Sequence, residues 1–359
     1  MIIPFFIPHA GCPHQCVFCN QTNITGQHSP TRAEDIAVTI DRYLTSRGRK
    51  KPVKPVSRGG SLATIGDQPS SIDDPDVQVA FYGGSFTALP LIEQEAYLEA
   101  ARPFIASGRI RAIRLSTRPD CISSMVLGLL MRYRVTTVEL GAQSMDDRVL
   151  TLAGRGHSSR DTVRAVSLLR EHRFAVGIQL MPGLPGDSAD IFRTTVDTVI
   201  GLKPDFVRLY PALVIKGTPL ERLYRAGKYD PLTLDAAVSI CREAYTKFEG
   251  AGISVVRMGL QPTEELERPG TILAGPWHPA FRQLVESSIF LDKMRAALSG
   301  ESGTRRTAVF AVSPRDVSAA IGQRRGNIER LKKEFGLADV RIVEGGHDGG
   351  RGKVVLREN

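Results

Sequence analysis

The sequence has no long apolar run and few cysteines, and each of these features argues against one class of protein. No stretch of its 359 residues approaches the roughly 20 consecutive apolar residues that a membrane-spanning helix requires. It has five cysteines, and residues 1–7 are apolar but lack the basic start of a secretory leader. We therefore expect a cytoplasmic protein without membrane contact, in which residues 1–7 form a buried strand.

Acidic residues are outnumbered, with 47 Lys and Arg against 38 Asp and Glu, so the net charge is +9. This excess fits a polyanionic partner such as nucleic acid. An ordinary basic enzyme fits equally well, because net charge speaks to partners and not to fold. The length predicts two or three domains.

Three of the five cysteines, Cys12, Cys16 and Cys19, lie within eight positions. Thiolates are soft ligands that select iron–sulfur clusters, zinc or copper(I). A [4Fe–4S] cluster usually takes four thiolates, and this C-x3-C-x2-C triplet has no fourth ligand at a natural distance downstream. The spacing therefore predicts a cluster with one iron open to an outside ligand.

The alternative is a structural zinc site completed by a histidine. The candidates for that fourth ligand are His9, His14 and His28. Zinc sites usually pair their ligands as C-x2-4-C, so the triplet spacing does not favour zinc. The remaining two cysteines, Cys121 and Cys241, are isolated and are expected to be small buried side chains.

Short apolar runs alternate with helical patterns along the first 210 residues. The predicted strands are 1–7, 77–82, 110–116, 135–140, 174–181 and 206–210. Helices are predicted at 31–44, 91–105, 122–131 and 191–200, and after residues 146 and 158. Capping boxes are predicted at the start of the first, from Thr31 and Glu34, and of the last, from Ser158 and Asp161. Six such units predict the α/β class, with a parallel sheet in a partial (β/α)6 barrel. Ligands of such sheets bind where the strands end, which is where the cysteine loop and residues 83–87, 116–120, 141–144 and 182–186 fall.

The domain boundaries follow from composition. We expect a core at 1–230, a helical and strand extension at 231–300, and a small α+β module at 301–359. Residues 46–76 are rich in Pro, Gly, Ser and basic residues, and we expect them to form a mobile insertion in the core.

The cysteine triplet, with the aromatic Phe18 directly before its last cysteine, resembles the signature of the radical S-adenosylmethionine (SAM) enzymes. The resemblance implies that the open iron chelates the amino and carboxylate groups of SAM, and that an electron from the cluster cleaves SAM to a 5′-deoxyadenosyl radical. It implies a partial barrel fold and a reductant protein such as a ferredoxin or flavodoxin. The turn Gly83-Gly84-Ser85 matches the family motif whose backbone holds the amino group of the cofactor.

Further motifs make this resemblance more specific. Residues 83–87, 117–120, 139–144, 155–157 and 181–186 look like the radical domain of the Elongator catalytic subunit, and the likeness continues to about residue 300. Nothing after residue 300 resembles the acetyltransferase domain of that family.

The chain is also similar, more loosely, to oxygen-independent coproporphyrinogen oxidase. In that family a glutamine after the fourth strand and an arginine twelve residues later hold the ribose and carboxylate of the cofactor, and Gln143 and Arg155 occupy matching positions. An amide suits ribose hydroxyls and a guanidinium fork suits a carboxylate. We include Gln179 in the cofactor-binding set, although it and Ser116 stand where that oxidase has acidic residues. Glu139 either faces the same interior or is a buried partner of Lys or Arg.

Residues 301–359 resemble a KH domain, whose GXXG loop clamps a nucleic-acid backbone. The predicted order is strand 307–312, helix 314–321 with Ser313 as N-cap, a basic loop 321–328, helix 329–335 and strand 340–343. A flexible turn at 345–352 and a final strand at 353–357 follow. The loop has Arg325 where the second glycine of GXXG should be. The predicted RNA-binding residues are Arg324, Arg325, Lys332 and Lys333. The alternative is a small α+β cap with a solvated basic face.

The sequence therefore predicts a radical SAM enzyme that modifies RNA, with tRNA as the leading substrate. One alternative is a radical SAM enzyme acting on a small molecule such as a tetrapyrrole. The other is a zinc-stabilised RNA-binding protein without catalysis.

Overall fold

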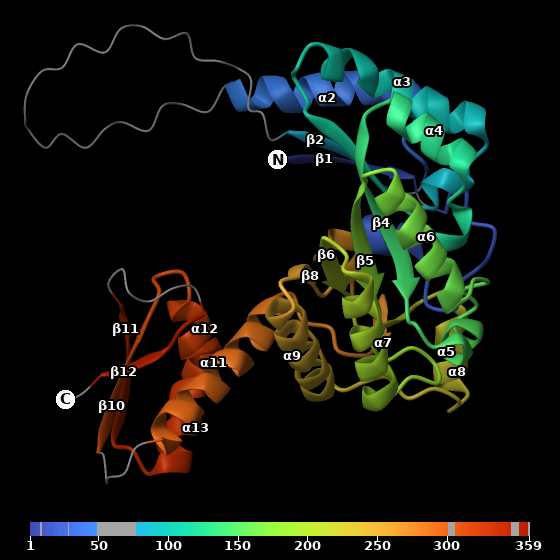
Figure 1. The fold of residues 1–359 in the computed structure, drawn as a ribbon. Coiled ribbons are helices and arrows are strands. Elements are labelled where there is room, and N and C mark those ends of the chain that lie inside the picture. Colours follow the sequence, from blue (N-terminus) through green and yellow to red (C-terminus); the bar gives the residue numbers. More distant parts are fainter. Residues whose placement is uncertain (8, 28, 49–76, 301–305, 346–351, 358–359) are drawn as a thin grey trace, which may run out of the picture. The chain divides into compact units, whose positions relative to one another are not determined.

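The computed structural model describes residues 1–359 except 8, 28, 49–76, 301–305, 346–351 and 358–359 (Figure 1). These residues divide into two compact units. The first contains Met1–Gln15, Gln21–Ala142 and Gly156–Ile178, and the second contains Cys16–Asn20, Gln143–Arg155 and Gln179–Asn359.

A seven-stranded sheet follows the order of the chain, β1-β2-β3-β4-β5-β6-β8. Its strands are β1 (Ile2–Ile7), β2 (Gln78–Gly83), β3 (Ala112–Thr117), β4 (Val135–Gln143), β5 (Ala175–Leu180), β6 (Phe206–Leu209) and β8 (Ser254–Met258). The pairs β1–β2, β2–β3, β3–β4 and β6–β8 are parallel. The predicted α/β class with a partial parallel barrel is confirmed. The seventh strand, β8, lies in the helical and strand extension predicted at 231–300, but the sequence does not predict that it joins the sheet.

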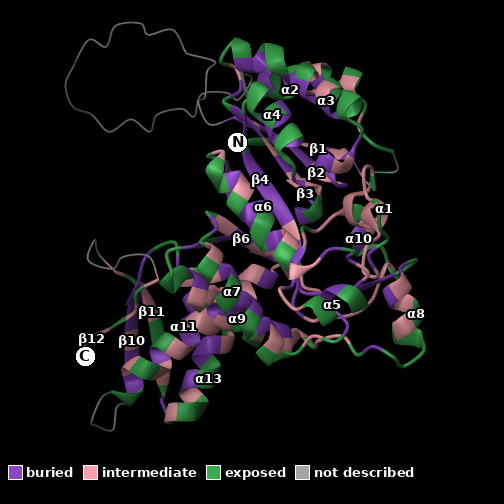
Figure 2. Cartoon of the chain, turned by 45° about the vertical axis from the view of Figure 1, so that its right-hand side comes forward, coloured by how far each residue is buried: buried purple, intermediate pink, exposed green. Residues whose placement is uncertain are grey.

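The helical elements of the first unit are α1 (Gln21–Thr25), α2 (Ala33–Gly48), η1 (Phe86–Ala88), α3 (Leu91–Ala106), η2 (Pro119–Cys121), α4 (Ser124–Arg132) and α6 (Ser159–Glu171). Aromatic side chains of β1, β2 and α3 pack together. Phe81 on β2 lies 5.8 Å from Phe5 on β1 and 5.7 Å from Tyr97 on α3, measured between ring centroids. Successive strand residues point to opposite faces, so Tyr82 lies on the face away from α3. Figure 2 shows how much of this sheet is buried.

Two of the predicted helix starts can be compared with the structure. The capping box of Ser158 and Asp161 is present at the start of α6, so that prediction is confirmed. The capping box predicted at Thr31 is wrong, because the Thr31 hydroxyl donates to the Phe6 carbonyl at 3.0 Å and α2 begins at Ala33. The predicted insertion 46–76 begins inside α2, which ends at Gly48, and its residues 49–76 lie outside the described part of the chain.

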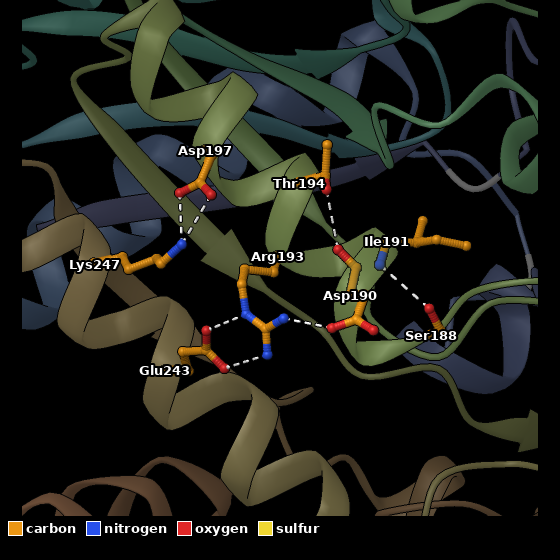
Figure 3. A network of polar contacts seen from close by, with 8 residues as sticks. All are labelled: Ser188, Asp190, Ile191, Arg193, Thr194, Asp197, Glu243 and Lys247. Carbon is orange, nitrogen blue, oxygen red and sulfur yellow. Dashed lines mark hydrogen bonds and ion pairs between the residues drawn. The ribbon is translucent and has the colours of Figure 1, made fainter.

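The second unit contains α5 (Asp147–Leu152), α7 (Ala189–Leu202), α8 (Pro219–Arg225), α9 (Leu234–Gly250), α10 (Glu264–Glu267) and α11 (Phe281–Ser299), with a two-stranded sheet of β7 (Val214–Ile215) and β9 (Ile272–Ala274). Ion pairs join α7 to α9 (Figure 3). Arg193 contacts Glu243 at 2.6 Å, and Lys247 contacts Asp197 at 2.7 Å. These side chains are partly exposed, so each pair adds little to stability.

The C-terminal module of the same unit has a three-stranded sheet, β11-β10-β12, made of β10 (Thr307–Val312), β11 (Asp339–Glu344) and β12 (Val355–Arg357). Between β10 and β11 lie α12 (Val317–Ile321), η3 (Gln323–Arg325) and α13 (Gly326–Phe335), in the predicted order. The first of these helices begins at Val317 with Asp316 as N-cap, so the predicted start at Pro314 with a Ser313 cap is wrong. Side chains of α11, including Phe290 and Met294, belong to the core of this module.

Two further predictions can be set beside the structure. Among the described residues, no helix is both long and apolar enough to cross a membrane. The tail predicted to be a flexible turn, 345–352, falls mostly on residues that the structure does not describe.

Candidate functional site

The segment that leads from β1 to Cys12 packs directly on the glycine turn after β2. The Gly84 N–H donates to the Ile7 carbonyl and the Ser85 N–H donates to the Ala10 carbonyl, both at 2.9 Å. The Cys12 sulfur lies 3.6 Å from the Ser85 hydroxyl. The structure therefore brings together the first predicted cluster ligand and the predicted glycine turn.

This packing explains why residue 84 is a glycine, which the sequence alone did not reveal. A Cβ atom at Gly84 would lie 2.6 Å from the Ile7 carbonyl oxygen and 2.9 Å from the Ala10 nitrogen, and would overlap the Ala10 carbonyl oxygen. The family motif assigns this turn to the amino group of the cofactor. The structure shows that Gly84 is needed for the close approach of the cysteine loop itself.

The hydrogen bonds within the turn also show which of its backbone groups are available to bind the amino group of a ligand. The N–H groups of Gly84 and Ser85 are already bonded to backbone carbonyls. An ammonium group donates hydrogen bonds, so it needs the carbonyl oxygens of the turn. The Gly83 carbonyl accepts from the Gln21 side chain at 3.1 Å, and a carbonyl oxygen has a second lone pair.

Cys16 in the second unit has an arginine as its neighbour. Arg155 Nη1 donates to Cys16 Sγ at 2.9 Å, and the two residues are only 6% and 7% exposed. Sequence spacing could not reveal this contact, because 139 positions separate the two residues. A guanidinium has five donors, so one bond to sulfur is compatible with the predicted role of Arg155 on a carboxylate.

The residues between Cys16 and Cys19 anchor the loop. The Val17 N–H donates to the Ala153 carbonyl at 3.0 Å, and the Leu220 N–H donates to the Val17 carbonyl at 2.8 Å. Phe18 is partly buried and packs against apolar clusters that contain Met181 and Tyr229. The packing gives Phe18 a structural role in holding the loop.

The two predicted amides lie together in the second unit. Gln179 Nε2 donates to Gln143 Oε1 at 3.2 Å. Gln143 is 4% exposed and has a φ of +70°, which L-residues other than glycine and asparagine seldom adopt. Such conformations concentrate at functional sites.

Glu139 has a basic partner. Arg114 Nη2 lies 2.8 Å from Glu139 Oε1, and the Tyr82 hydroxyl donates to the same oxygen at 3.2 Å. The side chains of Arg114 and Glu139 are 13% and 6% exposed. The structure shows the buried ion pair, and it lies on the sheet face opposite α3, so Glu139 combines the two features considered for it.

Asp187 is a further charged residue of a strand-end loop, and sequence reasoning missed it. It accepts hydrogen bonds from the backbone N–H groups of Gly183 and Ser188, both at 2.9 Å. Burial raises the pKa of Asp187 to about 6. Tyr229 donates to the Gly183 carbonyl at 2.6 Å, and burial raises its pKa as well. The sequence signal that could have identified Asp187 is its position as an acidic residue directly after Pro185-Gly186.

The basic loop of the C-terminal module exposes its two arginines. Arg324 and Arg325 have φ values of 49° and 62°, in the left-handed region. Asn327 anchors the loop from below, since its Nδ2 donates to the Ser287 carbonyl at 2.8 Å and to the Ala319 carbonyl at 3.2 Å. The other two predicted RNA-binding residues lie on α13, where Lys333 is exposed and Lys332 is half-buried.

The donor set fits an iron–sulfur cluster, because none of the five cysteines is in a disulfide and each can supply a thiolate. Within the described ranges, no three His, Cys, Asp or Glu side chains are grouped so as to hold a metal ion. The assignment of Cys12, Cys16 and Cys19 therefore rests on their spacing.

The zinc alternative finds no ready fourth ligand among the histidines that the structure describes. His9 Nε2 accepts from the Gln21 N–H at 3.0 Å. The ring of His14 packs on Gly156, where an added Cβ would lie 2.6 Å from the ring Cγ. His28 lies outside the described residues.

Comparison with known proteins identifies the family. The model of the radical SAM superfamily matches residues 6–199, and that of the radical SAM C-terminal domain matches 204–290. The chain belongs to the radical SAM superfamily, whose members are enzymes that use a [4Fe–4S] cluster and S-adenosylmethionine.

The curated relatives are Elongator-like. The chain is 28% identical to a tRNA uridine(34) acetyltransferase of Methanocaldococcus infernus over 262 residues, 64% of this chain and 46% of the relative. It is 27% identical to Elongator complex protein 3 of Schizosaccharomyces pombe over 269 residues, 65% of this chain and 46% of the relative. The chain thus spans about half the length of the curated relatives it matches.

A solved structure of the archaeal Methanocaldococcus infernus Elp3 with an N-terminal deletion has a similar fold. Its TM-score is 0.57 at 20% identity, and the match covers 80% of this chain and 62% of that chain.

Proposed function

We propose that this chain reductively cleaves S-adenosylmethionine in order to modify RNA, with tRNA as the substrate. The observation that carries the RNA assignment is the exposed pair Arg324 and Arg325 on the loop between α12 and α13. The net charge of +9 and the tRNA-modifying relatives support it. Guanidinium groups on an exposed loop neutralise backbone phosphates.

The cofactors would be held by residues that the sequence singled out. Cys12, Cys16 and Cys19 would ligate the cluster. The carbonyls of the turn Gly83–Ser85 would accept from the amino group of SAM, Gln143 and Gln179 would meet its ribose, and Arg155 would meet its carboxylate. When bound, the reduced cluster supplies the electron that cleaves SAM.

The proposed cofactors also indicate an electron donor and a cellular compartment. The cluster needs an external one-electron donor, and a ferredoxin or flavodoxin has the required chemistry. Cysteines outside disulfides and an oxygen-sensitive cluster suit the reducing cytoplasm.

Anaerobic reconstitution with iron and sulfide tests the cofactor assignment. We expect a brown protein that absorbs near ~400 nm, because cluster thiolates give charge-transfer bands there. Substituting any one of Cys12, Cys16 and Cys19 with Ala should abolish the band, whereas Cys121→Ala, the matched control, should retain it. A colourless protein with one zinc per chain would contradict the proposal and support the non-catalytic alternative.

Binding to tRNA as a function of salt tests the substrate class. The double variant Arg324→Ala/Arg325→Ala should bind tRNA more weakly and should reduce the slope of log affinity against log salt by about 2, one for each lost phosphate contact. The control removes the same charge from the same module through the exposed residues Arg306→Ala/Arg315→Ala. Negligible, salt-independent tRNA binding by a protein with an intact cluster would assign a small-molecule substrate instead.

A further inference from the structure

We propose that Arg155 sets the reduction potential of the cluster through its hydrogen bond to the Cys16 sulfur. This inference rests on the proposed ligation of the cluster by Cys16. It gives Arg155 an electrostatic role in addition to the predicted contact with the SAM carboxylate.

The contact is short and buried. Arg155 Nη1 lies 2.9 Å from Cys16 Sγ, and both residues are less than a tenth exposed. A charge this close to the sulfur and this far from water is weakly screened. The guanidinium cannot lose its proton in a protein, so the effect does not depend on pH.

The backbone holds the two partners in place without help from the arginine side chain. The Arg155 N–H donates to the Leu150 carbonyl at 3.0 Å, which fixes the end of α5. The Val17 N–H, next to Cys16, donates to the Ala153 carbonyl at 3.0 Å. The Arg155 side chain can therefore be changed while the loop and the sulfur keep their positions.

The direction of the effect follows from charge. The cluster gains one electron from the external low-potential donor and becomes more negative, while Arg155 keeps its charge. Hydrogen bonds to cluster sulfurs and nearby positive charge stabilise the reduced form and raise the potential. Arg155 therefore makes the cluster easier to reduce.

A redox titration of the reconstituted protein without SAM, followed by the EPR signal of the reduced cluster, tests this. At a fixed potential we expect the ratio of reduced to oxidised cluster to fall about tenfold in Arg155→Met, which is a shift of about 59 mV for a one-electron couple. The Arg155→Lys variant keeps a cationic hydrogen-bond donor, so its ratio of reduced to oxidised cluster should fall less. Because SAM is absent, a contact with its carboxylate cannot contribute.

Arg148→Met is the matched control, since Arg148 is exposed on α5 of the same unit. It loses the same charge without a contact to the sulfur, so its ratio should stay within twofold of the wild type. An unchanged ratio in Arg155→Met with full iron content would overturn the proposal. So would loss of the cluster from both Arg155 variants while Arg148→Met retains it, because Arg155 would then retain the cluster and not tune it. A wild-type chain that takes up no cluster would contradict the proposed function instead.

Discussion

Gly84 lies so close to the backbone of Ala10 that only glycine, which has no Cβ, fits at position 84. The carbonyl oxygen of Ala10 occupies the place where a Cβ of residue 84 would be, and the Ile7 carbonyl oxygen would lie 2.6 Å from that Cβ. The turn after β2 and the loop that carries Cys12 therefore form one interlocked piece of backbone.

The first prediction concerns this interlock. Gly84→Ala should cost about 1–3 kcal/mol of the free energy of unfolding, because backbone atoms must move to admit the methyl group. Urea denaturation measures it, and a lower iron content after reconstitution should accompany the loss.

Gly128→Ala is the matched control for that substitution. Gly128 is an exposed residue of α4, and outside the backbone of its own helix no atom lies within 4 Å of an added Cβ. Alanine there should gain about 0.5–1 kcal/mol from helix propensity. Equal effects at the two glycines would contradict the interlock.

The second prediction concerns the buried ion pair. Glu139→Leu removes a carboxylate from the buried Arg114 and should cost about 3–5 kcal/mol of the free energy of unfolding. Replacing both residues with Leu should cost less than that, because no buried charge then loses this partner. A double-mutant cycle from denaturant unfolding measures the coupling, and additive losses would argue against it.

The third prediction is a pH dependence at Asp187. Its pKa of about 6 in the folded protein lies above the usual value near 4 of an unfolded chain. The folded state therefore binds the proton more tightly, so the stabilising contribution is present in full below about pH 4 and is lost as the pH rises through 6. The wild type should gain stability relative to Asp187→Asn when the pH falls from 7 to 4.

Denaturant unfolding of both proteins between pH 4 and 8 measures this difference. Tyr229→Phe serves as the control, because it removes the hydrogen bond to Gly183 at every pH in that range and should lower stability by a constant amount of about 1 kcal/mol. Parallel curves for the wild type and Asp187→Asn would show that Asp187 is not the titrating group.

The fourth prediction concerns the left-handed conformation of Arg325. Arg325→Gly should stabilise the C-terminal module by about 1 kcal/mol, since glycine adopts a positive φ without the steric cost of a Cβ. Amide hydrogen exchange in β10 of the full chain measures this. Arg330→Gly, an exposed position of α13, should instead destabilise by about 1 kcal/mol. The same sign at both arginines would mean that the loop is not strained.

The strands that could be predicted are those whose apolar residues form compact runs. The runs at 77–82 and 110–116 correspond to β2 and β3, whose central residues Val79, Phe81, Ile113 and Leu115 are fully buried. In β8, Ser254 and Val256 are exposed and Val255 and Met258 are buried, so the alternation breaks after Val256, and this weaker pattern does not predict a strand of the sheet.

Contacts between distant residues account for what sequence reasoning could not find. The capping preference of Thr31 is overridden by the Phe6 carbonyl, 25 positions away. The helix of the C-terminal module starts late because a turn, in which the Asp316 N–H donates to the Ser313 carbonyl, comes first. The residues predicted around the cofactor were found through family motifs, whereas the contact of Arg155 with Cys16 needs the folded chain.

Val17 is a crossing point of three chain segments that are far apart in sequence. Its N–H binds the end of α5 at Ala153, and its carbonyl binds the start of α8 at Leu220. Metal ligation and folding are coupled wherever a ligand loop also carries structural bonds. We therefore expect oxidation of Cys16 or Cys19, which lie on either side of Val17, to weaken the bonds to both helices. The hydrogen-exchange rates of the Val17 and Leu220 amides should then rise when a sample is exposed to air.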